Sequence, residues 1–375
     1  MPSETFPHYR GAALSRLSAI EWSSRLKIWQ ERLEIMDERA NRPLMRAGLV
    51  LKFPRRPHQL TESITPLDGI FTLAHFGIPE SDGSPGEWTI EVDGMVQRPI
   101  RLTLDDLRRR PKRTVVSVHE CAGNPLKPKQ AVRAVANLVW SGPGLREILD
   151  EAGMDRAARF IWSYGIDYGE FGGLRSESYL KDLPLERVAM GDVILAYEMN
   201  GEPLTVEHGA PVRLFVPGYY GTNCVKWLRR MTLVDRRADG PLTTVFYNDA
   251  APRSRVTGRD AAPRPVWEIA PESVIVAPAP RTEIRAGEPF EIWGWAWAAR
   301  GVARVEVSTD SGATYDRASL AARQNWSWQR FAYEWTPVVE GAVTLAARAT
   351  DCDGVMQPGV GARNSIHKVG VRVRG

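Results

Sequence analysis

The sequence predicts an α+β domain followed by an all-β sandwich. Between residues 60 and 265, short strand patterns with frequent turns mix with short helical segments, without regular β-α-β alternation or a glycine-rich dinucleotide fingerprint. After residue 266, strand-like alternation recurs at short intervals, in residues 288–297, 303–308, 328–335 and 342–349. Closely spaced alternating strands are typical of an immunoglobulin-like sandwich. The chain is therefore divided into three segments, 1–59, 60–265 and 266–375.

The first segment, 1–59, is predicted to hold one amphipathic helix over residues 12–40 and an exposed connection. Apolar side chains recur at steps of three and four residues from Trp22 to Met36, while charged side chains take the opposite face. Asn41-Arg42-Pro43 ends the pattern. The apolar face suits packing against its own domain or docking of a second chain, and the sequence leaves both interpretations open.

The middle segment alternates strand and helix signals. Residues 88–92 alternate, Asp93-Gly94 is typical of a hairpin, and residues 100–104 begin the returning strand. The predicted buried strands are 115–118, 160–164 and 212–216, and the predicted short helices are 105–110 and 145–152. The polar, glycine-rich residues 168–179 are predicted to form a loop before a helical pattern at 183–190.

The composition excludes several functional classes. The 375 residues carry 49 basic and 45 acidic side chains, so the net charge of +4 lacks the basic excess of a nucleic-acid binder. The three cysteines are too few and too widely spaced for a disulfide framework. No apolar run is long enough for a membrane span, and the start lacks a secretory profile. We therefore expect a cytoplasmic protein, or a periplasmic one if an export signal has been removed.

A single cysteine, Cys121, follows the strand at 115–118 and precedes the strand-breaking Gly123-Asn124-Pro125. A thiolate at this place would suit a soft metal such as copper, zinc or iron. The basic residues near it in the sequence, which would favour the thiolate, are Arg113, His119, Lys127 and Lys129. One cysteine without a partner cannot make a zinc site, so spacing alone favours a buried, inert thiol.

A second group of residues suits an anion. His208 and Arg213 flank a Gly-Ala-Pro turn before an apolar strand, so both side chains can face one phosphate. The glycine-rich turn at 218–223 allows backbone N–H groups to approach an anionic ligand, and Lys226 adds a positive charge. From spacing alone, His208 could instead be a structural histidine and Arg213 a surface arginine, without an anion between them. Cys224 is predicted to be a packed or semi-exposed thiol.

In their order along the chain, these motifs resemble the sulfite oxidase family of molybdenum enzymes. The matching stretches are Glu120-Cys121-Ala122-Gly123-Asn124, residues 195–201, 208–213 and 217–221, and Val225-Lys226-Trp227-Leu228. The resemblance covers residues 60–375. It implies an α+β sulfite oxidase-like molybdopterin domain over 60–265, followed by an immunoglobulin-like dimerisation domain over 266–375.

The resemblance also implies roles for individual residues. Cys121 would be the only protein ligand to a molybdenum that a pterin dithiolene already holds, and Tyr179 would face the reacting oxygen. His208 and Arg213 would hold the terminal phosphate of the pterin. Further cofactor-binding residues are expected at His75, Ala122, Gly123, Asn124, Gly221, Thr222, Asn223 and Lys226. From spacing alone, Tyr179 fits a solvent-facing loop tyrosine equally well.

The implied function is that of a molybdenum-dependent oxidoreductase, which moves an oxygen atom and two electrons to or from a small substrate. A sulfite dehydrogenase proper and a reductase of a sulfoxide or nitrate are alternatives on the same scaffold. From another class, a non-catalytic dimeric adhesion protein with a vestigial site is also open. The implied partners are a second copy of the chain and, since no Cys-x-x-Cys-His haem motif occurs, a separate electron-transfer protein such as a cytochrome.

The chain departs from the family where an anionic substrate would bind. True sulfite oxidases carry Arg-Asn-His where this chain has Leu73-Ala74-His75, and paired arginines where it has Pro125-Leu126. Each charge-assisted hydrogen bond contributes about 1.5–3 kcal/mol, so losing two lowers the affinity for a doubly charged anion by about two to four orders of magnitude. We therefore expect a less charged, partly apolar substrate, unless Lys127, Arg175 or Arg330 supplies the missing charge.

Overall fold

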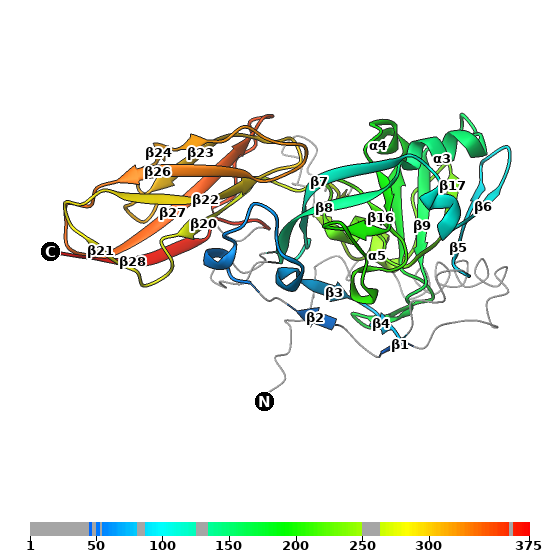
Figure 1. Cartoon of the computed structure of the whole chain (residues 1–375), viewed down its shortest axis with the longest axis horizontal. Helices are drawn as coiled ribbons and strands as arrows, with labels where there is room; N and C mark the ends of the chain where they lie inside the picture. Colours follow the sequence, from blue (N-terminus) through cyan, green and yellow to red (C-terminus); the bar gives the residue numbers. More distant parts are fainter. Residues whose placement is uncertain are drawn as a thin grey trace, which may run out of the picture.

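The computed structural model describes residues 45–46, 50–52, 55–80, 87–124, 134–249, 263–359 and 363–375. The helix predicted over residues 12–40 lies outside these residues, as do Leu126, Lys127 and Lys129. The described residues form two bodies that lie side by side, with the sheets of the middle segment at one end and the C-terminal sandwich at the other (Figure 1).

The first body is built on two sheets that share one hydrophobic core. The five-stranded sheet has the order β12-β9-β17-β5-β6, from β5 (Thr89–Gly94), β6 (Ile100–Thr103), β9 (Phe160–Gly165), β12 (Leu180–Pro184) and β17 (Leu228–Val234). Its strands pair antiparallel except β17 with β5. The four-stranded sheet has the order β15-β14-β8-β7, from β7 (Lys112–Glu120), β8 (Val135–Pro143), β14 (Glu198–Met199) and β15 (Glu202–Pro203).

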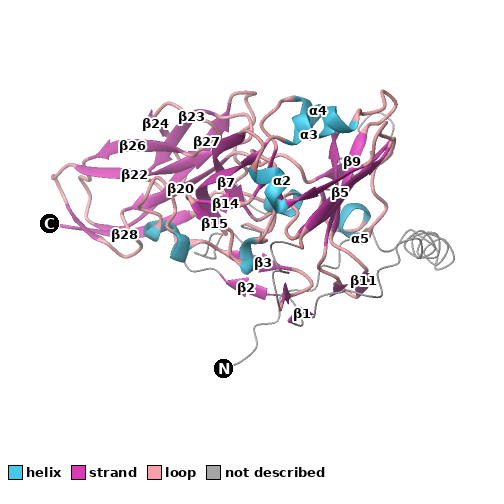
Figure 2. Ribbon diagram, turned by 45° about the vertical axis from the view of Figure 1, so that its right-hand side comes forward, coloured by secondary structure: helices cyan, strands magenta, loops and turns pink. Residues whose placement is uncertain are grey.

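Short helices pack against these sheets (Figure 2). They are α2 (Leu104–Arg108), α3 (Leu145–Ala152), α4 (Leu185–Ala189) and α5 (Pro241–Thr244). A capping box begins α2, because the Asp106 N–H donates to Thr103 Oγ1 and the Thr103 N–H donates to Asp106 Oδ2. Gly153 ends α3 in a left-handed conformation. The predicted helices at 105–110 and 145–152 are therefore found within one or two residues of their expected bounds.

Two predictions in this body are corrected. Residues 168–179 were expected to form a loop, but they contain a hairpin of β10 (Gly169–Phe171) and β11 (Leu174–Ser176). Gly172 and Gly173 both have positive φ angles, of 59° and 79°, as a tight hairpin turn requires. The helical pattern at 183–190 is realised only from residue 185, because Leu183 and Pro184 still pair with β9.

Two-stranded sheets complete this part of the chain. They join β1 (Met45–Arg46) to β4 (Ile78–Pro79), β2 (Val50–Lys52) to β3 (Thr72–Ala74), β13 (Ile194–Ala196) to β16 (Arg213–Phe215), and β18 (Asn248–Asp249) to β19 (Arg264–Pro265). Within the described part of the chain, no helix is long and apolar enough to cross a membrane.

The second body is the β-sandwich that the alternation after residue 266 predicts. One sheet has the order β20-β22-β26-β25, from β20 (Glu272–Ala277), β22 (Phe290–Trp297), β25 (Ser319–Leu320) and β26 (Gln329–Trp335). The other has the order β21-β28-β27-β23-β24, from β21 (Glu283–Arg285), β23 (Val302–Ser308), β24 (Asp316–Arg317), β27 (Gly341–Asp351) and β28 (Lys368–Arg374). The core between the two sheets includes Ile292, Phe331 and Leu345, all fully buried.

The two bodies meet along β7. The backbone of Trp326 pairs with this strand edge, accepting from the Val118 N–H and donating to the Val116 carbonyl, each at 3.0 Å. A separate buried cluster fills the junction and includes Val118, Trp295 and Trp328. Trp295 stacks on Trp328 with ring centroids 5.0 Å apart. The strand that leads to Cys121 is therefore held by both bodies.

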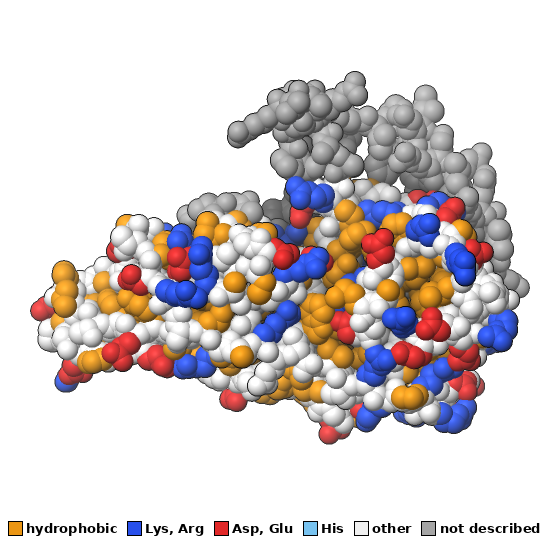
Figure 3. Space-filling model, turned by 90° about the horizontal axis from the view of Figure 1, so that it is seen from above, with side chains coloured by type: hydrophobic (Ala, Val, Ile, Leu, Met, Phe, Trp, Pro, Cys, Tyr) orange, Lys and Arg blue, Asp and Glu red, His pale blue; other side chains and the backbone are white. Residues whose placement is uncertain are grey.

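Charged side chains of both signs are interspersed over the described surface that Figure 3 shows, without one dominant basic patch. This distribution agrees with the small net charge of the sequence, +4.

Candidate active site

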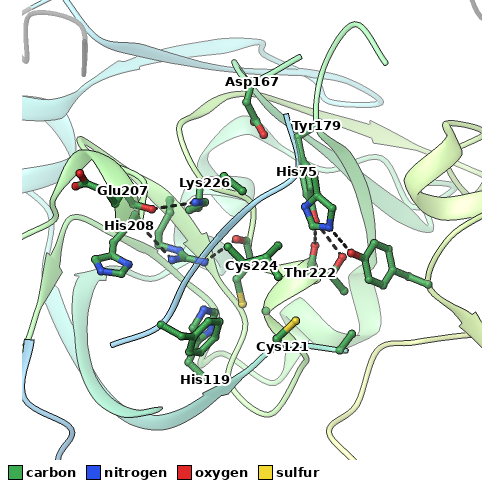
Figure 4. Close-up of a pocket in the computed structure, with 17 residues that line it drawn as sticks. His75, His119, Cys121, Asp167, Tyr179, Glu207, His208, Thr222, Cys224 and Lys226 are labelled. Atoms are coloured by element: carbon green, nitrogen blue, oxygen red, sulfur yellow. Dashed lines mark hydrogen bonds between the residues drawn. The ribbon is translucent and has the colours of Figure 1, made fainter. Parts of the chain in front are cut away.

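A pocket of about 610 Å³, part of it open to solvent, lies in the first body. Its walls come from β3, the end of β7, the residues after β9 and before β12, the 3-10 turns Val206–His208 and Gly221–Asn223, and residues 224–226 (Figure 4). The residues that line it are Phe71, Leu73, Ala74, His75, His119, Cys121, Ala122, Asp167, Tyr179, Glu207, His208, Arg213, Gly221, Thr222, Cys224, Lys226 and Tyr247. Distant parts of the sequence thus converge on Cys121.

Cys121 follows β7 directly and begins a tight turn. Its N–H donates to the Ala134 carbonyl at 2.9 Å, and the Gly123 N–H donates to its Sγ at 3.3 Å. Burial raises the pKa of the thiol to about 11. The sequence suggested a basic neighbourhood that favours the thiolate, whereas burial favours the neutral thiol. Of the basic residues near it in the sequence, Arg113 is engaged by Glu147 and by the Gly191 carbonyl, and Lys127 and Lys129 lie outside the described residues. A bound metal would have to displace the thiol proton.

Two cations line another part of the pocket, Arg213, which is buried, and Lys226, which is half-buried. Arg213 is 3% exposed, and its guanidinium donates to the carbonyls of His208 at 3.1 Å and Cys224 at 2.8 Å. Lys226 donates to the Glu207 carbonyl at 2.9 Å. Burial lowers the pKa of Arg213 to about 10, and burial together with the charge of Arg213 lowers the pKa of Lys226. The direction of both shifts shows that burial disfavours the positive charge of these side chains, and an anion bound beside them would offset that cost.

Tyr179 and His75 lie on the side of the pocket nearer Cys121 (Figure 4). The Tyr179 hydroxyl donates to the Thr222 carbonyl and also contacts Thr222 Oγ1, both at 2.9 Å. Tyr179 is buried, not solvent-facing, and burial raises the pKa of its hydroxyl. His75 Nε2 hydrogen-bonds the Tyr247 hydroxyl, and burial, with the charges of Lys226 and Lys181, lowers its pKa to about 3. The imidazole is therefore neutral at physiological pH.

Three of the expected cofactor-binding residues are not among those that line the pocket, namely Gly123, Asn124 and Asn223. Asn124 is buried, and its side chain donates to Glu120 and accepts from the Ala134 N–H. Asn223 is buried too, and donates to the carbonyls of Tyr220 and Val266. In this structure their side chains hold the two turns in shape. Cys224, predicted to be packed or semi-exposed, is buried and contributes to the pocket wall.

Sequence reasoning missed other residues of the pocket, above all Asp167 and Tyr247. Asp167 lies just after β9, where Ile166-Asp167-Tyr168 offers no motif, and Tyr247 lies far from the other motifs in sequence. His119 and Phe71 were not assigned to the pocket either, although their rings stack with centroids 5.4 Å apart. His119 is two residues before Cys121, and in an extended chain such residues face the same side, so this spacing was the available signal for His119.

The pocket fits a polar, anionic ligand that brings its own donors and acceptors. Arg213 Nε, His119 Nδ1 and Asp167 Oδ1 are buried there without a hydrogen-bond partner among the described residues. Each such atom costs about 1–3 kcal/mol until a ligand satisfies it. No group of three or more His, Cys, Asp or Glu residues in the described part of the chain could hold a metal. A metal bound here would need ligands beyond the protein. Of the two thiols that line the pocket, Cys224 is buried and accepts from the Val216 N–H, and Cys121 is the more exposed.

Comparisons with known proteins agree with this arrangement. Residues 75–242 match the model of the oxidoreductase molybdopterin binding domain, and residues 264–370 match that of the Mo-co oxidoreductase dimerisation domain. The mitochondrial sulfite oxidase of Rattus norvegicus is 30% identical over 91% of this chain and 68% of the rat protein. The chain belongs to the sulfite oxidase family. The family's expected cofactor, a molybdenum held by molybdopterin, fits the Cys121 thiol and the cations Arg213 and Lys226.

Two further relatives show the breadth of the sulfite oxidase family. The nitrate reductase [NAD(P)H] of Hordeum vulgare is 31% identical over 77% of this chain, which spans only 36% of the barley protein. The crystal structure of the sulfane dehydrogenase SoxCD from Paracoccus pantotrophus matches with a TM-score of 0.72 and 27% identity, over 97% of this chain and 92% of that one. The chain is thus a molybdopterin-dependent oxidoreductase with a dimerisation domain, and the non-catalytic adhesion alternative is set aside.

Proposed function

We propose that this enzyme moves an oxygen atom and two electrons to or from a weakly charged, partly apolar molecule, and that sulfite is an inefficient substrate. The observation that carries the proposal is Leu73, which lines the pocket where the resemblance places a substrate-binding arginine. Phe71 and Ala74 lie on the same wall. The two arginines that could replace the missing charge do not line the pocket: Arg175 pairs with Glu177 at 2.9 Å, and Arg330 pairs with Glu291 in the sandwich at 2.5 Å.

In this proposal the protein residues bind and orient, while the molybdenum centre supplies the oxygen-transfer and two-electron chemistry. Cys121 is the metal ligand, and Arg213, His208 and Lys226 hold the cofactor phosphate. Tyr179 presents its hydroxyl on the Cys121 side of the pocket, where Thr222 fixes its direction. The remaining cofactor-binding residues are proposed at His75, Ala122, Gly123, Asn124, Gly221, Thr222 and Asn223.

Steady-state kinetics with sulfite test the substrate proposal. Leu73→Arg restores one charge-assisted hydrogen bond, worth about 1.5–3 kcal/mol, so the Michaelis constant for sulfite should fall about 10- to 150-fold. Leu73→Met is the matched control, because it keeps the volume and stays uncharged, and it should leave that constant unchanged. Saturation of the wild-type enzyme by micromolar sulfite with fast turnover would make the protein a sulfite dehydrogenase.

The direction of oxygen transfer needs a panel of substrates. A sulfoxide and nitrate, each offered with a reduced artificial donor, test the reductase alternative. A sulfane-sulfur compound, offered with an oxidised acceptor, belongs in the panel because the similar SoxCD structure is named a sulfane dehydrogenase. We further propose a separate electron-transfer protein, such as a cytochrome, as the partner. Reduction of an added cytochrome during turnover supports this partner, and turnover that proceeds only with small acceptors opposes it.

A further inference from the structure

Glu120, the residue before Cys121, is a fully buried carboxylate at the junction of the two bodies. The Trp297 indole N–H from β22 donates to its Oε2 at 2.8 Å. The side-chain amides of Asn124 and Asn364 donate to its Oε1, each at 3.2 Å. A carboxylate without exposure to water depends on such donors, and hydrogen bonds to a charged acceptor are stronger than neutral ones. The sandwich supplies two of these three donors.

The same residues connect Glu120 to the turn that carries Cys121. The Asn124 N–H donates to the Cys121 carbonyl at 2.9 Å, while its side chain joins Glu120 to the Ala134 N–H. Asn364 is itself held, because its Oδ1 accepts from the Tyr220 hydroxyl at 3.0 Å. The position of the Cys121 turn therefore depends on Glu120, and the position of Glu120 depends on the sandwich.

We propose that Glu120 is a positioning residue through which the C-terminal sandwich orients the Cys121 thiolate toward the metal. The inference rests on the proposed role of Cys121 as the metal ligand. Groups that hydrogen-bond around a first ligand fix its orientation and tune the metal that it binds. The sandwich thus has a role in the active site of its own chain, in addition to dimerisation.

Two tryptophans of β22 give a matched pair of variants. Trp297→Phe removes the indole N–H that reaches Glu120. Trp295→Phe removes an indole N–H that reaches the Leu60 carbonyl at 2.6 Å across the same junction. Both indoles are buried in one cluster, so a loss of packing or of junction stability should affect both variants alike.

The readouts are the thiolate-to-molybdenum absorption band of the loaded enzyme, its molybdenum content and the separate kinetic constants. We expect Trp297→Phe to shift the band and to lower kcat about tenfold with KM unchanged. Trp295→Phe should keep the band and a kcat within about twofold of wild type. Equal behaviour of the two variants, or an unshifted band in Trp297→Phe, would overturn the inference.

Two further variants complete the test. Asn364→Ala removes a second hydrogen bond that the sandwich makes to Glu120, so this variant tests the inference if Trp297→Phe does not fold. A band shift in the same direction is expected, and an unchanged band refutes the inference. Cys121→Ser separates this result from the assignment of the ligand. If Cys121→Ser leaves the band intact, the proposed ligand itself is wrong.

Discussion

Replacing Arg213 by lysine should weaken cofactor binding as well as destabilise the cofactor-free protein. The guanidinium bonds two backbone carbonyls, those of His208 and Cys224, and a single ammonium cannot replace both bonds. Losing one charged bond costs the cofactor-free protein about 1.5–3 kcal/mol. Losing forked contact with the cofactor phosphate costs the loaded protein a similar further amount. Cofactor affinity should then fall about 10- to 150-fold.

Thermal unfolding of the cofactor-free and loaded forms, with molybdenum analysis of each, measures both losses. A ligand stabilises the folded state according to its affinity, so the gap between the two melting temperatures should narrow in Arg213→Lys. Arg187→Lys is the matched control, because Arg187 is also buried but bonds Asp192 and the Pro217 carbonyl outside the pocket. An unchanged gap in Arg213→Lys would refute a role in cofactor binding.

Three further outcomes are expected. Burial lowers the pKa of His75 to about 3 in the folded state, so the unfolded chain binds a proton that the folded protein does not. The free energy of unfolding of the cofactor-free protein should therefore fall by about 1.4 kcal/mol per pH unit between pH 6.5 and pH 3. Denaturant titrations of His75→Gln should show a smaller fall. Arg237→Met leaves the buried Asp182 carboxylate without its ion-pair partner and should lower the free energy of unfolding by about 3–5 kcal/mol. Arg285→Met removes one side of an exposed ion pair and should lower it by under about 1 kcal/mol in the same titration. Sedimentation at micromolar concentration should show a dimer, and a monomer would contradict the proposed role of residues 266–375.

Regular periodicity made most of the fold predictable. The alternation after residue 266 predicted the sandwich, and the apolar run at 115–118 predicted the centre of β7. The 168–179 hairpin was missed because its strands are three residues long and carry too little alternation to register. Its signal was the Gly172-Gly173 pair, which suits a two-residue turn.

The site residues that belong to sequence motifs could be predicted, and those that only the folding of the chain brings together could not. The motifs around Cys121, His208 and Lys226 placed residues that converge on one pocket. Asp167 and Tyr247 come together only through the packing of β9, β12 and the segment after α5, which no local pattern records. The raised pKa of Cys121 agrees with the buried thiol that spacing alone favours, and not with the thiolate that the nearby basic residues suggested, because burial disfavours the charged form.

X-ray absorption at the molybdenum edge tests the central claim, that Cys121 is the protein ligand to the metal, most directly. The measurement counts sulfur neighbours of the metal in the wild-type enzyme and in Cys121→Ser. With two sulfurs from the pterin dithiolene and one from the cysteine, about three are expected in the wild type and about one fewer in the variant. The same sulfur count in both proteins would contradict the account.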